Sequence, residues 1–250
     1  MIFYFHIGDR FVNEFYANPM DAFCLRSSGN ILMRNNITRK KITRRNINRD
    51  ETEGLEFLES VMHINPENWI DIDGCAQGKE DYYCRYGYSP KGEDCVVNQF
   101  VIADKTYSTM AAATCNGFLS WQIFDVPVTG DMFTAFVENH LSLYVTLDSV
   151  AMLDNALIHK TISSRRALER CFNGKYFYCA KYSPQLKPIE KCFALVKAHI
   201  RENEVEATLN PVRFINSAFE LFQIGGQRAA SIRGHWNEYF ALHDFFNAMI

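Results

Sequence analysis

The spacing of hydrophobic and polar residues changes from helical to strand-like near residue 69. A helix is predicted after Asp50, a suitable N-cap residue, and it ends before Pro66. Its apolar stripe consists of Leu55, Leu58, Val61 and Met62. From Trp69 onward apolar and polar residues alternate, which predicts a short strand over residues 69–73 that stops at Gly74.

Further strands are predicted over residues 96–103, 108–115, 118–124, 150–153 and 176–180. Asn116-Gly117 is a strong hairpin signal. The continuous apolar run that ends at Asp154 is typical of a strand buried on both faces. Helices are predicted from Thr129 or Gly130, over 162–172, and from Pro188 to about Glu202. Strands followed by strand–helix alternation indicate an α/β fold, a mixed sheet flanked by helices.

Composition narrows the class of protein. Of 250 residues, 48% are hydrophobic and 22% are charged, which is typical of a globular protein. No apolar run is long enough to cross a bilayer, so we expect an intracellular protein without a membrane partner. The 8 cysteines contain no C-x-x-C pair, which favours reduced, mostly buried thiols over a disulfide framework or a zinc site.

A basic run precedes the predicted core, although the net charge of −3 does not indicate nucleic-acid binding. No acidic residue interrupts the run, whose members are Arg34, Arg39, Lys40, Lys41, Arg44, Arg45 and Arg49. Such a run is usually a solvated surface. Its place just ahead of the core also suits an arm that contacts phosphates.

Acidic residues lie at the ends of two predicted strands. Asp71 and Asp73 share one face of their strand because side chains alternate with a period of two. Asp154 closes a hydrophobic strand, where an ionised carboxylate is costly unless it is paired or metal-bound. Glu190 lies in the first turn of the helix that begins at Pro188. The residues alone therefore indicate a carboxylate cluster near strand ends.

The helix that contains Glu190 has two distinct faces. A broad apolar face, expected to pack on the sheet, consists of Ile189, Cys192, Leu195, Val196 and His199. A narrow polar stripe on the other side contains Glu190, Lys197 and Arg201. The stripe suits a metal site that contacts a phosphate backbone. Taken alone, it is better explained as an exposed face with an acid near the helix N-terminus.

Three stretches resemble the signature motifs of mariner-like DDE transposases, which are DDE superfamily endonucleases. The first comprises residues 69–74 and 86–93, the second residues 153–160, and the third residues 182–191. They occur in the order of the family, and the separation between Asp154 and Glu190 matches that of its second and third acids. The resemblance covers roughly residues 37–205.

This resemblance implies an RNase H-like fold and a transposase-type DNA endonuclease and strand transferase that cleaves and rejoins DNA at transposon ends. It implies Asp71, Asp154 and Glu190 as catalytic acids that hold two Mg²⁺ or Mn²⁺ ions, with Asp71 bridging both. Expected partners are transposon-end and target DNA and a second copy in a homodimer. The location is nuclear in a eukaryotic host and cytoplasmic in a prokaryote. The expected DNA contacts are Arg39, Lys40, Lys41, Arg44, Arg45, Lys197 and Arg201.

Two motif positions depart from the family pattern. Ile72 replaces an acid, and Asp73 is either a substitute ligand or, as we favour, a cap of the strand end. Lys187 replaces an asparagine, and a cation there could pair with Glu190 or contact DNA. Asn155 and His159 match the second motif, where hydrogen bonding around the turn explains them at least as well as a catalytic role.

Three segments are expected: a basic remnant of a helix-turn-helix DNA-binding region at residues 1–49, a catalytic domain at 50–210, and a C-terminal helical extension at 211–250. Too few residues precede the core for the paired helix-turn-helix modules of the family. The alternative function is therefore a truncated or domesticated, catalytically inactive relic that binds DNA or a partner. Another RNase H-like enzyme, such as an RNase H or an integrase, is disfavoured because residues 183–190 resemble the transposase motif.

Overall fold

The computed structural model describes residues 50–82, 94 and 105–249. The chain divides into two units, Met1–Arg45 and Asn46–Ile250, and all described residues belong to the second. The basic arm with Arg39, Lys40, Lys41, Arg44 and Arg45 lies outside the described residues. So do the predicted strand at 96–103 and the motif at 86–93.

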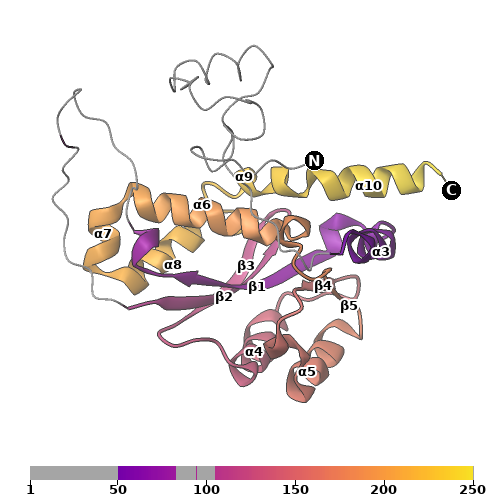
Figure 1. The fold of residues 1–250 in the computed structure, drawn as a ribbon, viewed down its shortest axis with the longest axis horizontal. Coiled ribbons are helices and arrows are strands. Elements are labelled where there is room, and N and C mark those ends of the chain that lie inside the picture. The colour runs from indigo at the N-terminus through magenta and orange to yellow at the C-terminus, as the bar shows by residue number, and fades with distance from the viewer. Residues whose placement is uncertain (1–49, 83–93, 95–104, 250) are drawn as a thin grey trace, which may run out of the picture. The chain divides into compact units, whose positions relative to one another are not determined.

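Within the described residues, a mixed five-stranded sheet forms the centre of the second unit, with the strand order β3-β2-β1-β4-β5 (Figure 1). The first three strands are antiparallel: β1 (Trp69–Gln77), β2 (Tyr107–Thr114) and β3 (Gly117–Phe124). β4 (Val150–Leu153) and β5 (Tyr176–Tyr178) continue the sheet in parallel with β1. The predicted mixed sheet is therefore confirmed.

β1 is longer than its sequence pattern predicted. It does not stop at Gly74 but continues to Gln77, where Gly74 pairs with Met110 and Gln77 pairs with Tyr107 of β2. The register with β2 extends over the whole added segment, so cross-strand pairing overrides the weak strand propensity of glycine. Asp73 consequently lies inside the strand, and its predicted role as a cap of the strand end is wrong.

The β2–β3 hairpin turns at Cys115 and Asn116, close to the predicted Asn-Gly signal. Gly117 opens β3 with a φ of 134°, a conformation that L side chains rarely adopt. A Cβ atom there would lie 2.7 Å from the backbone nitrogen of Ile224, whose N–H donates to Phe118 O at 3.1 Å. Glycine thus allows the chain that follows α8 (Pro211–Phe222) to approach the hairpin closely.

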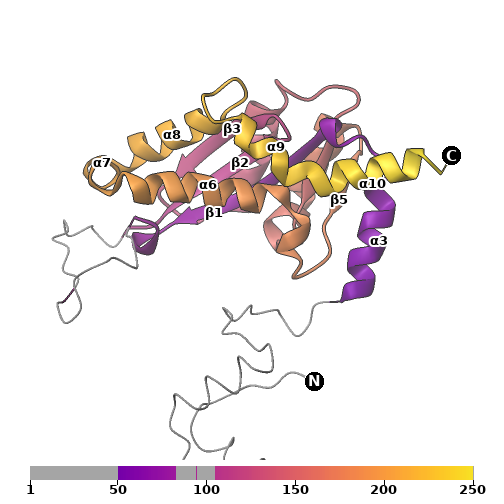
Figure 2. The same ribbon diagram turned by 90° about the horizontal axis from the view of Figure 1, so that it is seen from above.

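Helices cover both faces of the sheet (Figures 1 and 2). One face packs on α6 (Pro188–Glu202) and α8 (Pro211–Phe222), and the other on α4 (Gly130–Phe136) and α5 (Ile162–Phe172). The other α-helices in the part of the chain that the structure describes are α3 (Glu51–Val61), α7 (Glu204–Leu209), α9 (Ala230–Arg233) and α10 (Asn237–Asn247). No helix in the described part of the chain is long and apolar enough to cross a membrane.

Local signals placed several helix ends correctly. Asp50 accepts a hydrogen bond from Thr52 N at 2.8 Å and caps α3, and Thr129 caps α4 through Met132 N at 3.3 Å. Pro188 is the first residue of α6. The predicted apolar face of α6 is confirmed, since Ile189, Cys192 and Val196 are fully buried against the sheet. The described cysteines are free thiols, as expected; these are Cys75, Cys115, Cys171, Cys179 and Cys192.

Candidate active site

Asp71 and Asp73 lie on the face of β1 that packs against α6. Ile70 precedes Asp71, and Ile72 lies between the two aspartates. Both isoleucines contribute to the core on the opposite face of the sheet, because side chains alternate along a strand. Asp71 is completely buried and Asp73 is 8% exposed. Two carboxylates are therefore held under a helix, where they need compensating partners.

Lys187 supplies the compensating positive charge. Its Nζ lies 3.2 Å from Asp71 Oδ1 and 3.0 Å from Asp73 Oδ2, and it donates to Ile72 O at 2.9 Å. An ammonium carries three N–H donors, and three acceptors surround this one. Although burial lowers the pKa of Lys187, the Asp71 and Asp73 carboxylates raise it above its ordinary value, so the side chain stays charged.

The position of Lys187 corrects a prediction. A pairing with Glu190 or a contact with DNA was expected, but the side chain is 3% exposed and its ammonium contacts the two aspartates of β1. Lys187 immediately precedes α6, and the close packing of this helix on β1 carries the side chain inward. No local pattern indicated which acid the lysine would contact, because that choice depends on the docking of α6.

The Asp71 side chain, which projects from β1, is also held by the start of α6. Its Oδ2 accepts a hydrogen bond from the backbone N–H of Ile189 at 3.1 Å. Its Oδ1 has no directed hydrogen bond from any described residue, despite the nearby ammonium. Burial raises the pKa of Asp71 to about 6, while the Lys187 charge and the Ile189 N–H oppose this shift. The carboxyl is mainly ionised at neutral pH.

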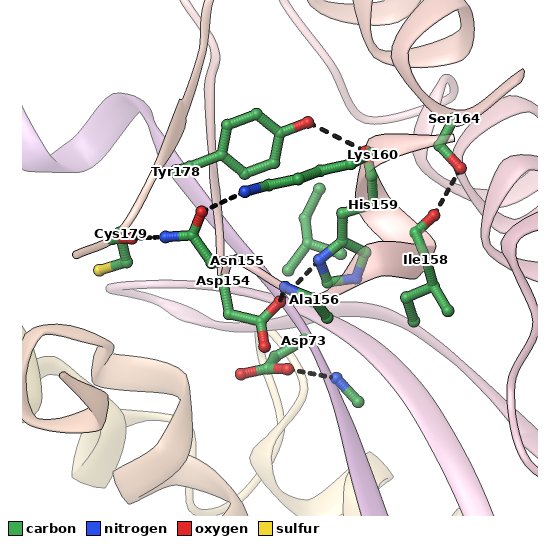
Figure 3. Close-up of polar contacts among 12 residues, drawn as sticks. Asp73, Asp154, Asn155, Ala156, Ile158, His159, Lys160, Ser164, Tyr178 and Cys179 are labelled. Atoms are coloured by element: carbon green, nitrogen blue, oxygen red, sulfur yellow. Dashed lines mark hydrogen bonds and ion pairs between the residues drawn. The ribbon is translucent and has the colours of Figure 1, made fainter. Parts of the chain in front are cut away.

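Asp154 follows β4, next to β1 in the sheet. Asp71 pairs with Met152 of β4 in the parallel register. Asp154 lies two residues after Met152, just past the end of that strand. Asp154 Oδ1 lies 2.7 Å from His159 Nδ1 and accepts from Ala156 N at 3.0 Å (Figure 3). Partial burial opposes ionisation, but these contacts and the Lys187 charge lower the pKa of Asp154 to about 2.

The residues around Asp154 form a connected turn (Figure 3). The side-chain amide of Asn155 donates to Cys179 O, and the Lys160 ammonium donates to Asn155 Oδ1. His159 is buried, and its ring centroid lies 4.5 Å from that of Phe133. Asn155 therefore has the expected structural role around the turn, whereas His159 also contacts the predicted catalytic acid.

Glu190 lies in the first turn of α6 and is exposed to solvent. Its carboxylate is still sensitive to the acid cluster, since partial burial and then the negative charge of Asp73 raise its pKa, with Lys187 opposing. A pocket of about 470 Å³ opens beside it, and its lining includes Asp154, Asn155, Lys187 and Glu190. The pocket thus brings together two of the three predicted acids, and Asp71 lies behind Lys187.

The three acids do not converge on a single point. Among the described residues, no group of three or more His, Cys, Asp or Glu side chains is placed to hold a metal ion. Asp71 and Asp73 instead share the Lys187 ammonium. The arrangement is a buried acid pair with its own cation, next to a pocket that carries Asp154 and Glu190.

The predicted DNA contacts on α6 occupy mixed environments. Lys197 Nζ lies 3.2 Å from Asp81 Oδ2, and Arg201 is half-buried. Asp81 was not considered from the sequence, because it lies far from α6 along the chain. Its pairing with Lys197 links the short 3₁₀ helix Lys79–Asp81 to α6.

Comparison with known proteins gives matches at the levels of family and fold. Residues 69–209 match the family model described as DDE superfamily endonuclease. The chain is 12% identical to the Mos1 mariner paired-end complex with Mn, with a TM-score of 0.66 over 88% of this chain and 68% of that chain. No curated protein sequence matches significantly.

Two other solved structures show the same fold. The Mos1 strand transfer complex has a TM-score of 0.54 at 13% identity and covers 86% of this chain and 69% of that chain. The mariner Mos1 paired-end complex with Mg has a TM-score of 0.57 at 14% identity, and the match covers 86% of this chain and 69% of that chain. The expected RNase H-like arrangement of a mixed sheet flanked by helices is confirmed by these likenesses.

Proposed function

Because this chain belongs to the DDE superfamily endonucleases, we propose that Asp71, Asp154 and Glu190 are its catalytic acids in DNA cleavage and strand transfer. One observation carries this assignment. The parallel pairing of β1 with β4 puts Asp71 next to the strand that Asp154 follows, and the first turn of α6 adds Glu190 at the pocket that Asp154 lines. Three acids that are far apart in the sequence therefore lie in neighbouring elements of the fold, which supports the assignment.

The side chains suit divalent metal ions by their chemistry. Carboxylate oxygens are the hard ligands that Mg²⁺ and Mn²⁺ prefer. Asp71 Oδ1 is a buried acceptor without a hydrogen bond from any described residue, and the Asp154 side chain is 41% exposed. The Mos1 complexes with Mn and with Mg support the same choice of metal. Two such ions, when bound, would activate the attacking water or 3′-hydroxyl and stabilise the leaving oxygen.

The surrounding residues of the chain prepare the acids for this role. His159 and the Ala156 N–H both contact Asp154 Oδ1, which orients the carboxylate and keeps it ionised. The Ile189 N–H fixes Asp71 against the start of α6. The pocket beside Glu190 offers space for a phosphodiester of the DNA backbone.

DNA is the proposed partner, both as transposon ends and as target, bound by a homodimer. The Mos1 paired-end and strand transfer complexes support DNA as the substrate class. On α6, Lys197 and Arg201 are proposed phosphate contacts, and Lys197 would exchange Asp81 for a phosphate. Nuclear or cytoplasmic location, according to the host, and the division at residues 49 and 210 belong to the same proposal.

A second candidate function is DNA or partner binding without catalysis. It is favoured by the Lys187 ammonium, which lies 3.2 Å from Oδ1 of Asp71, an acid that the catalytic function requires as a metal ligand. A relic of this kind would bind DNA through its basic residues and would not cleave it with either Mg²⁺ or Mn²⁺.

A nicking assay separates the two functions. Purified full-length protein should nick supercoiled plasmid DNA in the presence of Mn²⁺, and Asp154→Asn should abolish the activity. Asp244→Asn is the matched control, because this aspartate is 81% exposed on α10. DNA binding without nicking by the folded wild type, or equal nicking by Asp154→Asn, would contradict the proposed catalytic function.

A further inference from the structure

Lys187 is a buried cation, with a side chain that is 3% exposed. Among the Lys and Arg residues whose side-chain burial the structure describes, it alone is buried, and the lysines in the other ion pairs are partly or largely exposed. Its three contacts all come from consecutive residues of β1, namely Asp71, Ile72 and Asp73. The segment of β1 that contains Asp71, a proposed metal ligand, therefore already binds the ammonium of Lys187.

We propose that the Lys187 ammonium is a built-in counter-ion that competes with divalent metal ions for Asp71, so that Lys187 regulates metal loading of the site. The inference rests on the proposed function, in which Asp71 is a metal ligand. Lys187 is then a positioning residue, and its ammonium must move away from Asp71 before this carboxylate can bind a metal ion.

The competition follows from the contacts of the two Asp71 oxygens. Oδ2 is engaged by the Ile189 N–H, so Oδ1 is the oxygen available to a cation. The Lys187 Nζ lies 3.2 Å from that atom. A divalent ion on the same oxygen would come within a few ångströms of a positive charge, where repulsion is strong in a buried site. The ammonium and the metal ion therefore exclude each other at Asp71.

A route for withdrawal is available next to the site. Lys187 lines the 470 Å³ pocket together with Asp154 and Glu190. Its flexible four-carbon stem can carry the ammonium from β1 into this pocket by rotamer changes. The charge then remains near acidic partners, because Asp154 and Glu190 both interact electrostatically with Lys187.

The test is a calorimetric titration of the protein with Mn²⁺. It contains no DNA, so the readout does not depend on nuclease activity. Lys187→Gln and Lys187→Met remove the charge, and Lys105→Gln removes an exposed lysine that pairs with Asp125 at 3.3 Å. We expect both Lys187 variants to bind Mn²⁺ at least about tenfold more tightly than the wild type. Lys105→Gln should match the wild type. A purely structural lysine would give weaker metal binding when removed.

The outcomes separate this inference from the proposed function. Equal Mn²⁺ affinity in the wild type and both Lys187 variants would overturn the competition and leave the metal site in place. Failure of all the folded proteins to bind Mn²⁺ would overturn both.

If the Lys187 variants do not fold, NMR of wild-type protein with ¹⁵Nζ-labelled lysine decides the matter. The buried Lys187 signal should lose its protection from solvent exchange as Mg²⁺ binds. An unchanged Lys187 signal, while signals of neighbouring residues shift with Mg²⁺, would also overturn the inference.

Discussion

His159 Nδ1 lies 2.7 Å from Asp154 Oδ1, and the histidine that makes this contact is buried while the aspartate side chain is 41% exposed. The rigid partner is therefore the histidine, which packs on Phe133 below the site. A buried side chain of this kind fixes the direction of a more exposed carboxylate. The relationship gives His159 a role in positioning Asp154.

Replacement of His159 should impair the site more than the fold. We expect His159→Gln to reduce Mn²⁺-dependent nicking by roughly 10–100-fold, the usual cost of losing a group that orients a metal ligand. The rate of plasmid nicking at saturating Mn²⁺ measures the effect. His243→Gln is the control, since the polar contacts of His243 are with exposed residues of its own helix, Asp244 at 4.0 Å and Asn247 at 3.3 Å. A nicking rate for His159→Gln equal to that of the control would exclude the positioning role.

Loss of the Lys187 charge should destabilise the metal-free protein. Lys187→Met leaves Asp71 and Asp73 buried without a counter-ion, and we expect the free energy of unfolding to fall by about 3–5 kcal/mol. Urea denaturation at neutral pH measures the change. Lys181→Met, which removes an exposed lysine 3.9 Å from Glu53, should cost no more than about 1 kcal/mol. Similar losses in both variants would contradict a buried ion pair.

Asp154 and Asp71 should respond to pH in opposite directions. The pKa of Asp154 is lowered from 3.8 to about 2, so its contribution to stability is present above pH 4 and lost as the pH falls towards 2. Because the side chain is partly exposed, this contribution is on the order of 1 kcal/mol. The stability advantage of the wild type over Asp154→Asn should therefore shrink between pH 4 and pH 2 in denaturant titrations.

For Asp71 the sign is reversed, because its pKa is raised from 3.8 to about 6. Its contribution to stability is greatest below pH 4 and is lost as the pH rises through 6, by up to about 3 kcal/mol. Relative to Asp71→Asn, the wild type should lose stability between pH 4 and pH 6. The same series of denaturant titrations tests this, and a gain in relative stability over that range would contradict burial as the dominant cause.

Gly117 should tolerate no side chain. Gly117→Ala places a Cβ atom 2.7 Å from Ile224 N and 2.8 Å from Phe222 O at a φ of 134°, and we expect a loss of at least about 2 kcal/mol. Thermal unfolding measures the loss. Gly174→Ala has a positive φ of 76° but no atom within 4 Å, so it should cost only about 1 kcal/mol. Equal costs would show that the approach of residue 224 does not matter.

Sequence patterns were most informative where a local interaction decides the structure. Asp50 and Thr129 mark helix starts because a cap requires only residues two or three positions away. Pro188 marks the start of α6 for a similarly local reason. β1 was predicted too short because its last residues owe their strand conformation to pairing with β2, whose partner residues lie 30 or more positions further along the chain.

By itself, the sequence determined the order of the five described strands and of helices α3 to α6, and the apolar face of α6. It also contains the three ordered motifs from which Asp71, Asp154 and Glu190 were predicted. Only the tertiary structure decided what each acid touches. The docking of α6 on β1 sends Lys187 to Asp71 and Asp73, and the turn after β4 brings His159 to Asp154. These contacts depend on distances between elements remote in the sequence, and an ammonium leaving water takes whichever acceptors the packed elements bring within reach.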